Sequence, residues 1–78
     1  MAKTYNGHKN WNYWSVSLWV NNDEYLYRAA LNCVRRYPKA RDSAVRHFIG
    51  WLKDQGITKT PDGAPYSIGA VRAAMVGM

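Results

Sequence analysis

Apolar residues recur every three or four positions in four stretches of the chain, and polar or turn-forming residues separate these stretches. Such spacing places the apolar side chains on one face of a helix. The sequence therefore predicts an all-α protein, a small bundle of about four short helices, with residues 1–78 forming a single domain. Residues 1–9 are polar and form an N-terminal tail in this interpretation, with a turn at Asn6 and Gly7.

The first stretch, residues 11–20, fits two structures. Trp14 and Leu18 fall at helical spacing, which would place both in the core, and Asn10 can cap a helix that starts after it. Such a helix would also bring Val16, Trp19 and Val20 partly inward. The same segment also alternates between apolar and polar residues as a strand does, although Trp19 interrupts the polar face. We expect a helix, with a strand as the alternative.

The second stretch has clear start and stop signals. Asp23 is a good N-cap, and Glu24 places negative charge at the positive end of the helix dipole. Pro38 lacks an amide hydrogen and biases Tyr37 away from helical geometry, so the helix should end there. The expected buried stripe consists of Leu26, Ala30, Cys33, Val34 and Tyr37.

Two further helices follow. Asp42 or Ser43 should cap the third, and Gly56 should end it as a left-handed residue. Residues 57–65 contain a Thr-Pro-Asp-Gly turn and should form a loop or a small β wing. Ser67 should cap the last helix. The expected core positions of these two helices are Val45, Phe48, Ile49, Trp51, Leu52, Ile68, Val71 and Met75.

The composition indicates a chain that folds, and its single cysteine indicates a reducing compartment. Hydrophobic residues make up 47% and charged residues 21%, which is too apolar for a disordered chain. Cys33 is the only cysteine, so no internal disulfide and no multi-cysteine zinc site can form. No signal-peptide pattern and no apolar run long enough for a bilayer is present. We therefore expect a cytoplasmic protein without membrane contact.

The positive charge is concentrated in one segment. The formal net charge is +6, and residues 28–41 hold five of the eleven basic residues and no acidic residue. The dipole at the end of the second helix accounts for two of them at about 0.3–1 kcal/mol each, and the other three need another reason. We expect a surface that attracts an anionic partner. Its cations are Arg28, Arg35, Arg36, Lys39 and Arg41.

Aromatic residues are candidates for anchors on that surface. Tyr37 stands between the cations, and Trp11 or Trp19 can remain exposed on the less apolar side of the first helix. The predicted partner-binding residues are Arg28, Arg35, Arg36, Tyr37, Lys39, Arg41 and Trp19. Lys59 and Arg72 are additional candidates for contacts to nucleic acid.

Catalytic and metal sites have weak support. Cys33 and His47 could pair as nucleophile and base, but Cys33 falls on the apolar stripe and no third group orients His47. His8 and His47 lack the spacing of a metal site. No phosphate-binding glycine loop is present. We expect no enzymatic activity, no metal, no cofactor and no small-molecule substrate.

Residues 5–24, YNGHKNWNYWSVSLWVNNDE, resemble small uncharacterised proteins of phages and prophages. These share an asparagine, a later tryptophan, a Val/Leu/Trp run and then Asn-Asp or Asn-Glu. The matching residues here are Asn10, Trp14, Val16, Leu18, Trp19, Asn22, Asp23 and Glu24. The resemblance implies a mobile genetic element, in which compact proteins often block host defences, as anti-CRISPR proteins do by covering a surface of a larger effector.

Residues 51–75 resemble the small DNA-binding repeat of large serine recombinases, in which a helix ends in Gly-Ile and a turn leads to a capped recognition helix. The matching residues are Gly56, Ile57, Thr60, Gly63, Tyr66, Ser67, Val71 and Arg72. The segment departs from that pattern where DNA would be read, because Gly69, Ala70, Ala73 and Ala74 offer almost no side chain to base edges.

The sequence thus leads to two main functional expectations, and a small structural or assembly protein is a third possibility. The first is a non-enzymatic inhibitor of a host defence complex, anti-CRISPR-like, that docks its basic, aromatic surface on an effector protein or nucleoprotein in the host cytoplasm. The alternative is a DNA- or RNA-binding accessory protein of a mobile element that uses the same cations.

Overall fold

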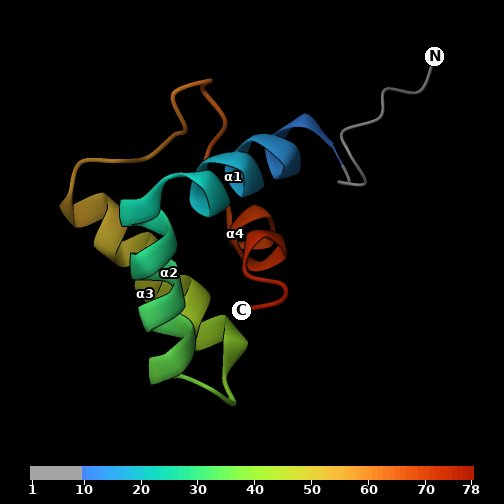
Figure 1. Cartoon of the computed structure of the whole chain (residues 1–78). Coiled ribbons are helices and arrows are strands. Elements are labelled where there is room, and N and C mark those ends of the chain that lie inside the picture. The colour runs from blue at the N-terminus through green and yellow to red at the C-terminus, as the bar shows by residue number, and fades with distance from the viewer. Residues whose placement is uncertain (1–9) are drawn as a thin grey trace.

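The computed structural model describes residues 10–78 and contains four helices, which confirms the all-α fold. They are α1 (Trp11–Asn22), α2 (Glu24–Arg36), α3 (Arg41–Asp54) and α4 (Ile68–Ala74). In Figure 1, α2 and α3 lie side by side and antiparallel, α1 crosses one end of this pair, and α4 packs against α1. The expected turn at Asn6 and Gly7 lies outside the described residues.

Three of the four helices begin at the caps that the sequence predicts. Asn10 Oδ1 accepts a hydrogen bond from the Tyr13 amide, Asp23 Oδ1 from that of Leu26, and Ser67 Oγ from that of Ala70. Asp23 also ends α1 in an extended conformation, so one residue both separates α1 from α2 and starts α2.

The start of α3 differs from the prediction of a cap at Asp42 or Ser43. The N-cap is Ala40, which makes no side-chain capping bond, and both predicted caps lie inside the helix. The turn after Pro38 brings the chain into helical geometry two residues earlier than the capping side chains indicate. The predicted end is confirmed, because Gly56 has a φ of 76°, which glycine adopts without steric cost.

The first stretch is a helix, and the prediction of its buried side is only partly correct, because Val16 and Val20 lie inward as expected but Trp14 and Leu18 are not core residues. Trp14 is half-buried and Leu18 is 37% exposed, whereas Ser15, Val16 and Val20 are fully buried. The reason is a contact with the loop of residues 57–65, which crosses α1 on the side of Ser15. There Ser15 Oγ lies 2.9 Å from Thr60 Oγ1, so the serine can be buried without losing its hydrogen bond.

Elsewhere the predicted core is mostly correct. Ile68 is the main exception, because it is 54% exposed. The small residues Ala70 and Ala74 are buried in α4, and they turn the inner face of this seven-residue helix away from Ile68. Tyr37, Ile49 and Trp51 are half-buried at the margin. The buried positions that agree with the prediction are Leu26, Ala30, Cys33, Val34, Val45, Phe48, Leu52, Val71 and Met75.

Residues 57–65 form a loop closed by one bridge. Lys59 and Pro65 make an isolated antiparallel β-bridge, and residues 10–78 contain no strand beyond it. Thr60 Oγ1 accepts from the Ala64 amide at 3.1 Å, and Trp19 Nε1 donates to Asp62 Oδ2 at 2.9 Å. The loop is therefore fastened both to itself and to α1.

Candidate functional site

A groove runs between α2 and α3 on one side of the molecule. It consists of two adjoining pockets of about 440 and 420 Å³, which share Asn32, Cys33 and His47. We call it the α2–α3 groove. Its lining residues are Tyr25, Arg28, Ala29, Asn32, Cys33, Arg35, Arg36, His47 and Trp51.

One end of the α2–α3 groove is aromatic. The rings of Tyr25 and Trp51 have centroids 5.2 Å apart and are tilted by 53°. Trp51 in turn stacks on the buried Phe48, with centroids 5.9 Å apart. Tyr25 remains 62% exposed, so a ring that the core supports from one side offers much of its surface to a partner.

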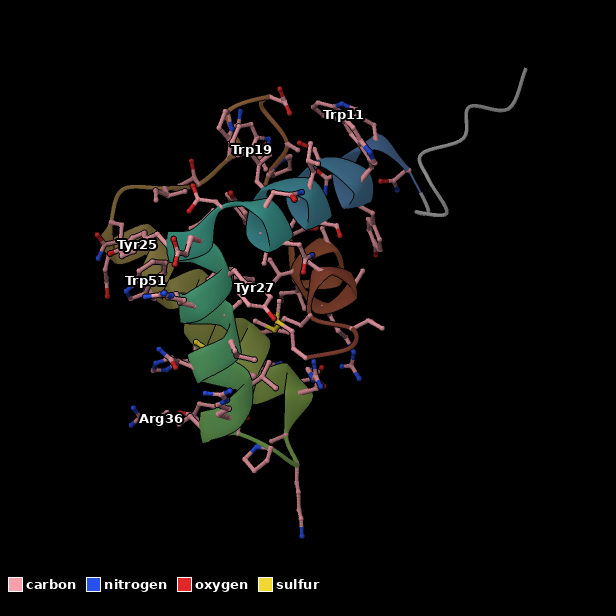
Figure 2. All side chains as sticks on the ribbon, in the orientation of Figure 1. Trp11, Trp19, Tyr25, Tyr27, Arg36 and Trp51 are labelled. Carbon is pink, nitrogen blue, oxygen red and sulfur yellow. The ribbon has the colours of Figure 1, made fainter. Side chains whose placement is uncertain are left out.

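The other end is basic. Arg35 and Arg36 are exposed and line the groove together with His47, and within the described part of the chain neither arginine has an ion-pair partner. Figure 2 shows Arg36 on the same side of the molecule as Tyr25 and Trp51, farther along α2. Neither pocket has a carboxylate in its lining. The groove therefore presents an aromatic end and a cationic end without an acid to neutralise it.

Arg28 lies between the two ends and is held by a weak ion pair. Its Nη2 atom is 2.6 Å from Glu24 Oε1, and the two side chains are 73% and 75% exposed. An exposed pair one helical turn apart contributes only about 0.3–0.5 kcal/mol. A phosphate or a carboxylate of a partner can therefore displace Glu24 from Arg28.

The structure does not bring all of the predicted cations together. Arg41 is half-buried and donates from Nη1 to the carbonyl oxygen of Met75 at 2.6 Å, so it links the start of α3 to the end of α4. Lys39 is exposed in the connection between α2 and α3. Neither side chain lines the α2–α3 groove. Since Arg28 has Glu24 beside it, the fully unpaired part of the predicted patch is smaller than the five residues expected.

The remaining predicted contact residues are occupied or distant from the groove. Tyr37 caps the end of α2, and its ring lies 5.7 Å from that of His47. Trp19 is half-buried and hydrogen-bonded to Asp62 in the loop of residues 57–65, so it is not a free anchor. Arg72 pairs with Asp42. Lys59 is exposed in that loop, on the side of a separate pocket that Trp19 also lines.

Cys33 and His47 line the same pocket, but their chemistry does not suit nucleophilic catalysis. Cys33 is 6% exposed, and burial raises the pKa of its thiol despite the opposing charge of Arg36. A raised pKa keeps the sulfur protonated and unreactive near neutral pH. Within residues 10–78 no three His, Cys, Asp or Glu side chains gather as a metal site would require, and His8 lies outside that range. No helix in the same range is long and apolar enough to cross a bilayer.

Six groove residues were absent from the predicted binding surface: Tyr25, Ala29, Asn32, Cys33, His47 and Trp51. One signal could have found them. The connection of residues 37–40 is so short that α2 and α3 must run antiparallel. This places the start of α2, with Tyr25, beside the end of α3, with Trp51, and the end of α2 beside His47.

Comparison with known proteins gives a family without an assigned activity. A search of the curated proteins and a search of the solved structures each returned no match. One family model, described as a family of unknown function (DUF7249), matches residues 1–78. The match covers the whole sequence, and the chain therefore belongs to the DUF7249 family.

Proposed function

We propose that this protein is a non-enzymatic inhibitor of a host defence complex, anti-CRISPR-like, that docks the α2–α3 groove on an anionic surface of an effector protein or nucleoprotein. The phage setting is supported by the resemblance of residues 5–24. The docking surface is supported by one structural observation: the unpaired Arg35 and Arg36 and an aromatic pair with one exposed ring line a groove without a carboxylate.

This combination of residues suits a binding surface. Arginine forms bidentate hydrogen bonds to carboxylate and phosphate groups, and Arg35 and Arg36 present two such groups next to each other. Tyrosine, tryptophan and arginine dominate the energetics of interfaces when they lie near the centre of a contact. Tyr25 and Trp51 provide the aromatic part of that centre, one exposed and the other half-buried.

The test is phage plating on strains that each carry one defence system. Expression of the protein should restore plating of a targeted phage on the strain whose system it inhibits. The Arg35→Glu/Arg36→Glu variant should lose this effect and keep its helical circular dichroism spectrum, because both side chains are exposed. The matched control is Arg46→Glu/Lys53→Glu, which makes the same charge change at exposed positions of α3 outside the groove.

Two results would contradict the proposal. One is plating that stays unchanged on every strain of the panel. The other is equal loss of protection in the groove variant and the control variant, since general charge rather than the groove would then be responsible.

A second candidate function is that of a DNA- or RNA-binding accessory protein of a mobile element. The observation in its favour is that the exposed aromatic ring of Tyr25 lies next to cations, as in many nucleic-acid-binding sites. Duplex recognition by α4 has less support, because Arg72 pairs with Asp42 and Ala70, Val71 and Ala74 are buried. A mobility-shift assay with duplex DNA at low salt tests this form directly, and a lack of binding there would exclude it.

A further inference from the structure

We infer that the α2–α3 groove binds a short single-stranded segment of nucleic acid, with a base stacked on Tyr25 and the phosphates held by the arginines of α2. The inference deepens the proposed function, because it names the chemistry that the same groove takes: an exposed strand of a nucleoprotein effector. It rests on three features of the groove: its aromatic end, the alignment of its cations and its concave shape.

The aromatic end has the properties of a stacking platform. Tyr25 is 62% exposed, yet Trp51 supports its ring at a centroid distance of 5.2 Å, and Trp51 itself stacks on Phe48 in the core. A ring held in this way loses little freedom when a base covers it. The adjacent pocket of about 440 Å³ lies within the range of about 300–1,000 Å³ that is typical of ligand pockets, so it has room for a base.

The cations follow the aromatic end along one face of α2. Tyr25, Arg28, Asn32 and Arg35 are three, four and three residues apart, a spacing that keeps them on the same side of a helix. From Tyr25 to Arg36 the helix rises about 16 Å, at about 1.5 Å per residue. This length corresponds to about five stacked nucleotides at about 3.4 Å each. The groove can therefore hold a base at one end and several phosphates beyond it.

The shape of the site favours a single strand over a duplex. Aromatic rings bind bases through their faces, and a duplex hides these faces inside its stack. Duplex readers insert a protruding helix or ribbon into the major groove, whereas here the functional side chains line a hollow between two helices. An acidic peptide would pair with the arginines but would give the exposed ring of Tyr25 no flat partner.

Fluorescence anisotropy with labelled oligomers tests the inference on the full chain. The probes are an oligothymidylate and an oligouridylate of about ten nucleotides, about twice the span of the groove. A duplex of the same length and an oligoglutamate peptide are the comparison probes. We expect the single strands to bind more tightly than the duplex and the peptide. The logarithm of the affinity should fall with the logarithm of the salt concentration with a slope of about −2, since about three arginines contact phosphates.

Two variants separate stacking from charge. Tyr25→Ala should lower the affinity for single strands about 5- to 20-fold, the lower part of the range for loss of one stacked base, and leave the salt slope unchanged. Arg35→Glu/Arg36→Glu should abolish binding at moderate salt. The matched controls are Tyr27→Ala, at an aromatic residue of the same helix outside the groove, and Arg46→Glu/Lys53→Glu. Both controls should keep the wild-type affinity.

Glu24→Gln gives a test in the opposite direction. It removes the carboxylate that holds Arg28, and the affinity for a single strand should rise about twofold, the equivalent of an exposed ion pair. Misfolding would lower the affinity for a single strand, so it cannot explain a rise in affinity. An unchanged or lower affinity would contradict the role of Arg28.

Three outcomes would overturn the inference: equal or tighter binding of the duplex, tighter binding of the acidic peptide, or a Tyr25→Ala variant that binds single strands as the wild type does. Its failure can be told apart from that of the proposed function. Restored phage plating without strand binding would leave an inhibitor that contacts an acidic protein surface. Binding of single-stranded nucleic acid without any effect on phage plating would support the proposed ligand of the groove and contradict the proposed function as an inhibitor.

Discussion

Replacing Arg41 by methionine tests whether this cation is structural or belongs to the binding surface. Its guanidinium donates to the Met75 carbonyl oxygen at 2.6 Å in a partly buried contact between the start of α3 and the end of α4. Methionine keeps much of the aliphatic stem and removes the donor. We expect a loss of stability with no specific loss of partner binding.

Two opposing effects set the magnitude for Arg41→Met. A hydrogen bond from a charged donor contributes about 1.5–3 kcal/mol, and partial exposure places this one in the lower half of that range. Arg41 is also the first residue of α3, where a positive charge opposes the helix dipole, so removal of the charge returns about 0.3–1 kcal/mol. The hydrogen bond is the larger effect, and the net loss should be about 0.5–2 kcal/mol. In a domain of this size that lowers Tm by about 2–15 °C.

Thermal denaturation followed by far-ultraviolet circular dichroism measures this change. Arg46→Met is the matched control, because Arg46 is exposed in the middle of the same helix and has no ion-pair partner among residues 10–78, so its replacement should alter stability by no more than about 0.5 kcal/mol. An unchanged Tm for Arg41→Met would refute the structural role. Arg41 would then return to the predicted binding surface.

Three further predictions concern the fold itself. Gly69→Ala should destabilise the protein by about 1–3 kcal/mol in urea denaturation, because the added Cβ would clash with the Tyr13 hydroxyl. Tyr13→Phe should relieve much of that loss, and equal losses in both backgrounds would contradict the prediction. Gly50→Ala should stabilise α3 by about 0.5–1 kcal/mol, since beyond the neighbouring residues and backbone of its own helix nothing lies within 4 Å of the added Cβ. A lower urea midpoint would contradict this prediction. Burial raises the pKa values of the Cys33 thiol and the Tyr66 hydroxyl above their ordinary values of 9.0 and 10.0. The native state therefore holds these protons more tightly than the unfolded chain, and Tm should fall as the pH rises past about 9. A Tm that is constant up to pH 11 would exclude this effect.

The sequence was sufficient to predict where the four helices lie, but it was less reliable in predicting which face of each helix is buried. Capping at Asn10, Asp23 and Ser67 is a local interaction, so the starts of three helices followed from neighbouring residues. The buried side of α1 depends on a segment 45 residues away, where Thr60 meets Ser15. Hydrophobic periodicity favours Leu18 for the core. It contains no information about the hydrogen bond between Ser15 and Thr60, which allows the side of α1 that carries Ser15 to be buried instead.

The candidate site shows the same division between near and distant contacts. The pairing of Arg28 with Glu24 could be read from the sequence, because residues four apart share a helix face. The engagement of Arg41 by Met75 could not, since 34 residues separate them. A run of unpaired cations in a sequence therefore gives an upper limit on the charge that a partner meets. Aromatic groups such as Trp51 enter the surface only after two helices pack, so the groove is a property of the α2–α3 pairing rather than of either helix alone.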